Sequence, residues 1–165
     1  GLANYYLKKQ GVNDEIDGFK LYSENLRGIE GTSLIRLLTN GKVDGLPSVK
    51  GKRYKIKSID FVSGSVSSID EGLKKNGGLV FSYNVMDGDP FHKRIDKKFN
   101  LRVATTSHAM VIVGCDEENK RYKIANSWGV NFGEKGYFYI PFVLMNKKYL
   151  EAIYSFSLEK VGIII

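Results

Sequence analysis

Cysteine, tryptophan and histidine are the scarce residues of this chain. Among 165 residues there are one cysteine, one tryptophan and two histidines. A single cysteine excludes a disulfide within the chain and any zinc site built from several thiolates. It leaves the redox compartment undecided, so the sequence does not indicate where the protein works.

Long apolar runs are missing as well. No stretch reaches the roughly 18 to 20 apolar residues that a membrane-spanning helix requires, so we expect no membrane partner. Hydrophobic residues nevertheless make up 42% of the chain and aromatic residues 12%. This composition excludes a disordered chain or a coiled coil and predicts a globular one.

The positive charge is spread thinly along the chain. The net charge is +7, but the lysines stand in separate pairs such as Lys8 and Lys9 or Lys147 and Lys148. No basic helix or RNA-binding signature is present, so we expect solvated surface and no nucleic-acid partner. A basic adaptor for an acidic partner is the alternative that this charge leaves open.

One stretch, residues 106–140, contains the cysteine, the tryptophan and one histidine. His108 opens the run HAMVIVGC, whose β-branched and apolar residues are typical of a buried strand. The next five residues are polar and turn-like, and RYKIANSW resumes an extended pattern. The stretch therefore predicts a β-hairpin.

The predicted hairpin brings His108 and Asn126 to the same end, because antiparallel pairing places the start of one strand beside the end of the other. An amide bonded to an imidazole fixes its tautomer and orientation, as in a nucleophile–base–orienter set. Trp128 can cover that hydrogen bond. Each residue alone is as well explained as an ordinary strand-end or turn residue, but their coincidence favours a functional site.

Three segments, SHAMVIVG, IANSWG and FGEKGYFYIP, resemble the C-terminal half of the papain-like cysteine peptidases. The resemblance implies that His108 is the catalytic base, Asn126 its orienter and Trp128 their shield, with the small Ser107 facing the cleft beside them. It implies peptide-bond hydrolysis by a Cys-His-Asn mechanism on a peptide or protein substrate, without a cofactor or metal. Phe132 stands where an aromatic residue, usually tryptophan, is common, and it keeps the apolar body of that residue.

The nucleophile of such a site is missing from the printed sequence. Cys115 lies seven residues beyond His108 on the same predicted strand, which separates the two side chains by roughly 20 Å. A thiolate and its base must lie within hydrogen-bond reach. We therefore expect Cys115 to be a small buried hydrophobic residue at a strand end. In papain-like enzymes the Cys precedes its His by roughly 130 to 150 residues, which predicts a glutamine and then a cysteine upstream of Gly1.

The first part of the chain is predicted to be helical. Residues 2–10 favour a helix that Gly11 ends, and Thr32 or Ser33 can cap a second helix that stops at Asn40 and Gly41. Residues 13–26 give no clear prediction. The string EGTSLIRLLTNGKVDGLP resembles the region after the cysteine helix in bacterial and viral papain-like sequences.

The second part is predicted to be rich in strands, over residues 53–62, 79–85 and 151–159. Ser68 and Glu71 form a capping box that predicts a helix ending at Gly77 and Gly78. Residues 86–107 are irregular and contain His92, which has no second ligand at metal spacing, so we expect a solvated loop.

The expected class is α+β: a papain-like fold with an antiparallel β-barrel-type half and a truncated helical half. Residues 1–48 would be the remnant of the helical half, and residues 49–165 the β-rich half that carries His108 and Asn126. Exposed apolar surface over residues 2–7 and 34–38 would then favour self-association or binding of the missing N-terminal segment.

Three functional hypotheses follow. The first is the C-terminal portion of a papain-like peptidase, which supplies His and Asn, lacks the nucleophilic Cys and is inactive alone. The second is a peptidase homologue without a nucleophile, a pseudoenzyme that acts as a peptide- or protein-binding module. The third is the basic adaptor.

Overall fold

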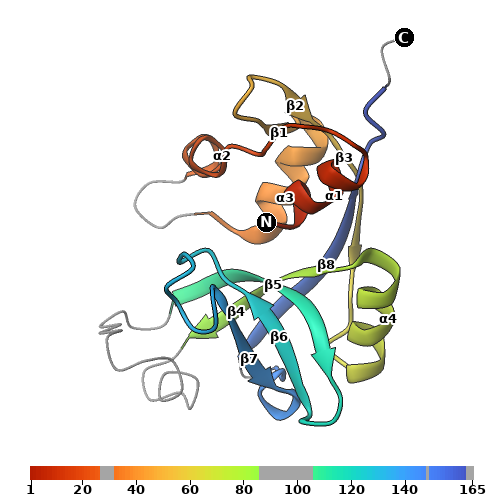
Figure 1. Cartoon of the computed structure of the whole chain (residues 1–165), viewed down its shortest axis with the longest axis vertical. Helices are drawn as coiled ribbons and strands as arrows, with labels where there is room; N and C mark the ends of the chain where they lie inside the picture. The colour runs from red at the N-terminus through yellow and green to blue at the C-terminus, as the bar shows by residue number, and fades with distance from the viewer. Residues whose placement is uncertain (27–31, 86–105, 148, 163–165) are drawn as a thin grey trace. The chain divides into compact units, whose positions relative to one another are not determined.

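A computed structural model of the chain describes residues 1–26, 32–85, 106–147 and 149–162. The chain forms two compact units, one made of Gly1–Asp60 with Phe156–Ile165 and the other of Phe61–Ser155. It passes from the first unit to the second within strand β3 (Ile56–Phe61) and returns within strand β8 (Leu150–Leu158), as the colours of Figure 1 show.

The first unit contains the helices α1 (Leu2–Lys9), α2 (Gly18–Asn25) and α3 (Leu34–Val43) and the short antiparallel strands β1 (Leu46–Pro47) and β2 (Arg53–Tyr54). Helix α1 was predicted, and Gly11 follows it with a φ of 72°. Helix α2 was not predicted. Its first turn is capped by Asp17, whose carboxylate accepts a hydrogen bond from the backbone N–H of Lys20 at 2.9 Å.

Helix α3 begins where the sequence predicts, because the Ser33 hydroxyl accepts a hydrogen bond from the backbone N–H of Arg36. The predicted stop at Asn40 and Gly41 is wrong, since the helix continues to Val43. A Cβ at Gly41 would lie only 2.7 Å from Cδ2 of Leu46 and 2.8 Å from Cδ1 of Ile56. Glycine is therefore needed for close packing at this position and does not end the helix.

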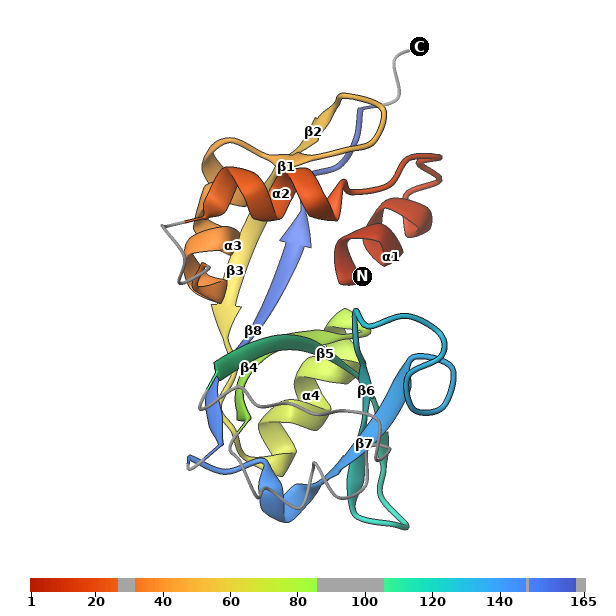
Figure 2. The ribbon, with the colours of Figure 1, turned by 90° about the vertical axis from the view of Figure 1, so that its left-hand side faces the viewer.

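The second unit contains helix α4 (Val66–Asn76), strands β4 (Leu79–Val85), β5 (Thr106–Asp116), β6 (Arg121–Ala125) and β7 (Tyr137–Pro141), and the 3₁₀-helix η1 (Phe142–Leu144). The sheet has the strand order β3-β8-β4-β5-β6-β7. Helix α4 lies along one face of it, as Figure 2 shows, and buries Ile69 in the core with Phe81 and Ile112. The predicted α+β class and the predicted hairpin, β5 with β6, are confirmed.

The start of α4 differs from the prediction. The helix is capped by Ser65, whose hydroxyl accepts a hydrogen bond from the backbone N–H of Ser68, so Ser68 lies inside the first turn and the predicted capping box is wrong. Several serines precede this helix, and the sequence pattern alone does not choose among them. The predicted end is confirmed, because Gly77 follows the helix in the left-handed conformation.

The expectation of a buried Cys115 is wrong, because this residue is exposed. The pairing of β5 with β6 shifts between Ile112 and Gly114, which leaves Val113 as an extra residue. Cys115 lies beyond this bulge, next to a hollow of about 250 Å³ beside α4. Solvent therefore reaches the end of the strand.

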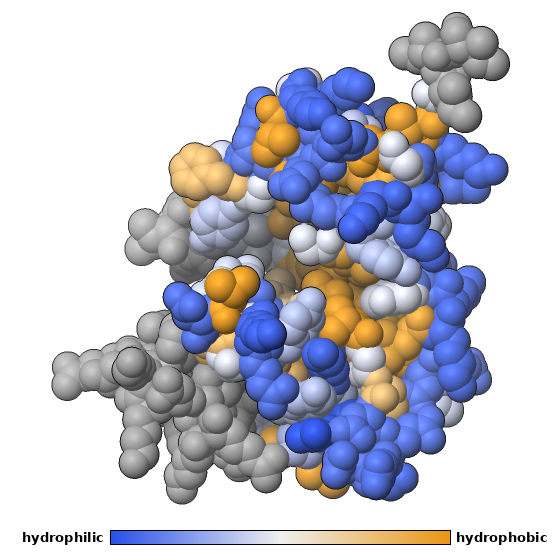
Figure 3. Space-filling model, viewed as in Figure 1, coloured by the Kyte–Doolittle hydropathy of each residue, from blue (hydrophilic) through white to orange (hydrophobic). Residues whose placement is uncertain are grey.

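The apolar segments predicted to be exposed are only partly so. Leu2, Leu7 and Leu38 are buried, whereas Tyr5 and Ile35 are exposed. Figure 3 shows apolar surface, in orange, interrupted by hydrophilic residues in blue. No helix in the described ranges is both long enough and apolar enough to span a membrane. His92 and most of its predicted loop lie outside the described residues.

Candidate active site

His108 lies near the start of β5, opposite Tyr83 of β4. Its Nε2 atom is 2.9 Å from Oδ1 of Asn126, the residue that directly follows β6. Both side chains are half-buried. The contact predicted from the hairpin is thus confirmed, and it joins residues that are 18 positions apart in the sequence.

The hydrogen bonds around Asn126 determine which way its amide points. Oδ1 also accepts a hydrogen bond from the backbone N–H of Ser127 at 2.8 Å, so the oxygen and not the NH₂ group must face His108. An amide oxygen only accepts, and Nε2 of His108 therefore carries the hydrogen. In a neutral ring this makes Nδ1 the nitrogen that can take up a proton.

The turn after β6 holds Asn126 in place. The backbone N–H of Asn126 donates to the carbonyl of Gly136 at 3.1 Å. Gly136 has a φ of 90° and Gly129 a φ of 86°, conformations that residues with a Cβ rarely adopt. The path of this turn therefore favours glycine at both positions.

Trp128 covers the histidine with its ring. The rings of His108 and Trp128 are stacked with centroids 4.7 Å apart and an interplanar angle of 22°. Phe132 is buried and meets Trp128 edge-on at 4.9 Å, and Phe138 meets Phe132 edge-on at 5.6 Å. The sequence predicted that Trp128 covers His108. It did not predict that Phe138 packs behind Phe132, because the position of Phe138 depends on the pairing of β6 with β7.

Ser107 points away from His108, because successive side chains of a strand lie on opposite faces of the sheet. Its hydroxyl and that of Ser82 each donate to Oε2 of Glu151 at 2.6 Å. These hydrogen bonds lower the pKa of the Glu151 carboxyl. The expectation that Ser107 faces the cleft stays a prediction, and sequence reasoning did not foresee this three-residue network.

A model of the Peptidase C1-like family matches residues 27–161. The chain belongs to this family. The resemblance to the papain-like cysteine peptidases is thereby confirmed.

Curated relatives agree with this assignment. The cathepsin B-like cysteine proteinase 2 of Haemonchus contortus is 36% identical over 91 residues, which is 54% of this chain and 26% of that protein. Aminopeptidase E of Lactobacillus helveticus is 42% identical over 60 residues, which is 29% of this chain and 14% of that protein. The matches thus span about a quarter or less of the length of these relatives.

Solved structures show the fold. Xylellain, a cysteine protease from Xylella fastidiosa, is similar with a TM-score of 0.74 and 18% identity over 94% of this chain and 75% of that one. The proCathepsin B S9 from Trypanosoma congolense is similar with a TM-score of 0.69 and 14% identity over 94% of this chain and 64% of that one. The papain-like fold predicted from the sequence is therefore confirmed.

Cys115 is poorly suited to nucleophilic chemistry in this papain-like chain. It is the last residue but one of β5, whereas His108 is the third. Partial desolvation of its thiol and the neighbouring Asp70 carboxylate raise its pKa to about 11. The thiol is therefore protonated at neutral pH, and only a thiolate is strongly nucleophilic.

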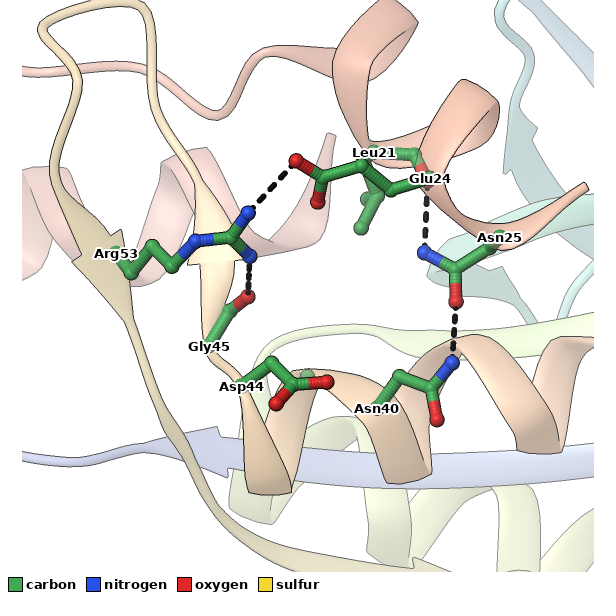
Figure 4. Close-up of a pocket in the computed structure, with 8 residues that line it drawn as sticks. Leu21, Glu24, Asn25, Asn40, Asp44, Gly45 and Arg53 are labelled. Atoms are coloured by element: carbon green, nitrogen blue, oxygen red, sulfur yellow. Dashed lines mark hydrogen bonds and ion pairs between the residues drawn. The ribbon is translucent and has the colours of Figure 1, made fainter.

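A separate pocket of about 380 Å³ lies in the first unit, between α2, α3 and β2 (Figure 4). Arg53 on its wall forms an ion pair with Glu24 at 2.6 Å and donates to the carbonyl of Gly45. Asn40 donates to Oδ1 of Asn25 at 2.7 Å. These polar groups bond to one another, so the arrangement is that of a structural network that holds the helices together.

Proposed function

We propose that this chain supplies the general base and its orienting amide to a papain-like cysteine peptidase that hydrolyses peptide bonds in peptides or proteins. The observation that carries the proposal is the 2.9 Å contact between Nε2 of His108 and Oδ1 of Asn126. With the hydrogen on Nε2, the opposite ring nitrogen is the one that can accept a proton from a thiol.

The chemistry then follows from the two nitrogens of His108. Nδ1 takes the proton of a cysteine thiol, and the imidazolium keeps its Nε2–H bond to Asn126 while the thiolate attacks the peptide carbonyl. The proton next passes from Nδ1 to the leaving amine, and water hydrolyses the acyl-enzyme. The Trp128 ring would keep water away from the His108–Asn126 bond throughout.

The thiol must come from a cysteine other than Cys115, and the 165 residues contain no other. We therefore propose that a cysteine-bearing segment completes the site and that the chain alone is inactive. In this proposal residues 1–48 are the remnant of the helical half of the fold, and residues 49–165 form the β-rich half with the base.

The position of Cys115 also favours a second candidate, a peptidase homologue without a nucleophile that binds peptides or proteins. In that case the stacked Trp128 and the aromatic residues behind it would serve to shape a binding wall. The two candidates differ in one respect, namely whether a thiol reaches Nδ1 of His108.

The test compares the 165-residue chain with the chain extended by the coding sequence upstream of Gly1. We expect the extended protein to cleave fluorogenic peptides and to react with an epoxide directed at active-site thiols. His108→Ala should lower its turnover by about 10²–10⁴-fold, Asn126→Ala should lower it less, and His92→Ala is the matched control. The 165-residue chain should neither cleave the peptides nor react with the epoxide.

Two outcomes would contradict the proposal. One is labelling of Cys115 in the 165-residue chain that His108→Ala prevents. The other is an upstream sequence without cysteine, together with peptide binding that leaves the peptide intact, which would support the binding module. Binding that is abolished by moderate salt would instead point to an acidic partner and the adaptor hypothesis.

The partner proposed for this chain is the cysteine-bearing segment or, without it, a second copy. The exposed side chains that motivate this are Tyr5, Ile35 and Val43, the last of which is 64% exposed. Sedimentation of the 165-residue chain should reveal association that grows with concentration, and a monomer at high concentration would speak against it.

A further inference from the structure

Glu151 is the extra residue of a β-bulge in β8. Ser82 of β4 pairs with Ala152, but the next residue, Tyr83, pairs with Leu150, so Glu151 has no directly paired residue on β4. Regular alternation from Ala152 would turn Glu151 to the face of the sheet away from Ser82. The bulge instead directs its carboxylate toward Ser82, whose hydroxyl donates to Oε2 at 2.6 Å. Bulges often redirect a side chain in this way next to active sites.

The same carboxylate oxygen joins three strands. Ser107 of β5 also donates to Oε2 of Glu151 at 2.6 Å, so β8, β4 and β5 are linked through one atom. Glu151 is exposed, but Ser82 is buried, with 6% exposure. The two hydrogen bonds lower the pKa of the carboxyl, so it is ionised at neutral pH. Hydrogen bonds to an ionised group are roughly twice as strong as those between neutral groups.

This link lies where β5 is held on one side. His108 lies opposite Tyr83 of β4, just past the bulge. The pairing of β5 with β6 begins only at Val111, three residues beyond His108. Among the described residues, β4 alone therefore pairs with the backbone of the proposed base. The residue that Glu151 holds, Ser107, directly precedes that base.

Ser107 provides the route from the carboxylate to the base. Successive side chains of a strand lie on opposite faces, so a bond that holds Ser107 on one face also limits the rotation of the backbone that carries His108 on the other. Strand β5 begins at Thr106, so this bond acts close to its first residue. Strand ends open more easily than strand centres, and the bond to Glu151 opposes that opening.

We propose that Glu151 is a positioning residue for His108, on which it acts through Ser107. The inference rests on the proposed function, in which Nδ1 of His108 takes the proton of a thiol. The carboxylate fastens the start of β5 to β4 and β8, and this fixes the angle at which the imidazole meets that thiol. A misplacement of about 1 Å can cost a catalytic group about 10²-fold in rate. Asn126 and Trp128 hold the ring, and Glu151 holds the backbone that carries it.

The first test uses the 165-residue chain and needs no activity. Exchange of the His108 Nε2–H with water is measured by ¹⁵N-edited NMR. We expect Glu151→Ala to speed this exchange by about 10-fold, the effect of losing a hydrogen bond to a charged group. Glu151→Gln should restore most of the protection, because its amide oxygen still accepts from both hydroxyls. Gly41→Ala, a destabilising substitution in the first unit, is the control for overall stability and should leave the exchange unchanged.

The second test uses the chain extended upstream of Gly1. Glu151→Ala should lower kcat by about 10-fold and leave KM nearly unchanged, since a positioning residue acts on the chemical step. Ser107→Ala should have the same effect. The double variant of Glu151→Ala and Ser107→Ala should be no slower than either single variant, because both substitutions remove one bond. A carboxylate that touches the substrate would instead raise KM when removed, and Ser107→Ala would then stay active.

The proposal is overturned if Glu151→Ala leaves the exchange of the His108 Nε2–H unchanged, if Gly41→Ala speeds that exchange equally, or if the kinetic effect falls on KM. An extended protein that contains an upstream cysteine and is still inactive would refute the proposed function, and the NMR comparison would then decide the role of Glu151 by itself. An active extended protein whose kinetics Glu151→Ala does not alter would leave the proposed function standing and refute the positioning role.

Discussion

The ring of Trp128 stacks on the ring of His108, with centroids 4.7 Å apart and planes inclined by 22°. This contact covers one side of the imidazole that Asn126 holds through Nε2. Removing the ring by Trp128→Ala should expose the hydrogen bond to water and remove an aromatic pair worth about 0.5–1.5 kcal/mol.

The measurement for Trp128 is ¹⁵N-edited NMR of the side chains of the two histidines. The Nε2–H signal of His108 should be visible in the unaltered chain, lost by exchange with water in Trp128→Ala, and retained in Trp128→Phe. A signal that survives in Trp128→Ala would mean that the ring does not protect the bond.

Gly133 and Gly129 both have positive φ values, 52° and 86°, in the turn that holds Trp128. A Cβ at Gly133 would overlap with the carbonyl oxygen of Tyr137, whereas a Cβ at Gly129 would meet nothing within 4 Å. Gly129→Ala should therefore cost only the left-handed conformation, about 1 kcal/mol, and Gly133→Ala at least about 1 kcal/mol more because the backbone must move. Urea unfolding followed by the fluorescence of the single tryptophan would measure both, and equal losses would refute the clash.

Gly41 in α3 and Gly18 in α2 form a second matched pair. Alanine is the better helix former by about 1 kcal/mol, and Gly18→Ala should stabilise the chain by up to that amount, since nothing lies within 4 Å of a Cβ there. Gly41→Ala should destabilise it by about 1–2 kcal/mol, because crowding against Leu46 and Ile56 outweighs the propensity gain. Thermal unfolding of both variants measures these changes in stability. A stabilised Gly41→Ala variant would show that Leu46 and Ile56 move aside at little cost.

Glu151 predicts a dependence of stability on pH. Hydrogen bonds from Ser107 and Ser82 lower the pKa of its carboxyl from the ordinary value of 4.5. Such a carboxyl stabilises the folded state fully at pH values above its pKa in the unfolded chain. This contribution is lost as the pH falls through its lower pKa in the folded chain. Because Glu151 is exposed, solvent screening limits the contribution to ~1 kcal/mol.

The check is urea unfolding of Glu151→Gln at several pH values. The variant should be less stable than the unaltered chain at pH 7, and the difference should shrink as the solution is acidified below about pH 4.5. Glu71→Gln, which removes an exposed carboxylate of α4 outside this network, serves as the control variant. A constant difference across the whole range would mean that the hydroxyls do not favour the ionised carboxylate.

The hairpin was predictable because its two strands are close in sequence and each has a clear pattern. Antiparallel pairing alone places His108 and Asn126 at the same end of the hairpin. That their side chains also share a face depends on the shift in pairing between Ile112 and Gly114, which the sequence did not predict. The strand Leu79–Val85 was predictable for a similar reason, its high β-propensity. The division of the chain at residues 48 and 49 stays a proposal.

Other features depend on tertiary packing and could not be read from local patterns. Gly41 lies inside helix α3, where a Cβ would crowd the side chains of Leu46 and Ile56, a contact that only the folded chain reveals. Helix α2 has a single clear signal, the Asp17 cap, within a segment of mixed composition. The side of the sheet on which Ser107 lies could be inferred by alternation from His108, but its partner Glu151, 44 positions away, could not.

The extra residue Val113 reverses the side of the sheet on which the following side chains of β5 lie. Counting from His108, Cys115 would face the opposite side of the sheet, yet the shifted pairing returns it to the side of Tyr122 and α4. One strand therefore presents an imidazole and a thiol to the same interior, at opposite ends. A spectroscopic label attached through this one thiol would report on the seating of α4 while leaving the histidine end chemically untouched, so that motions of the two ends could be followed separately.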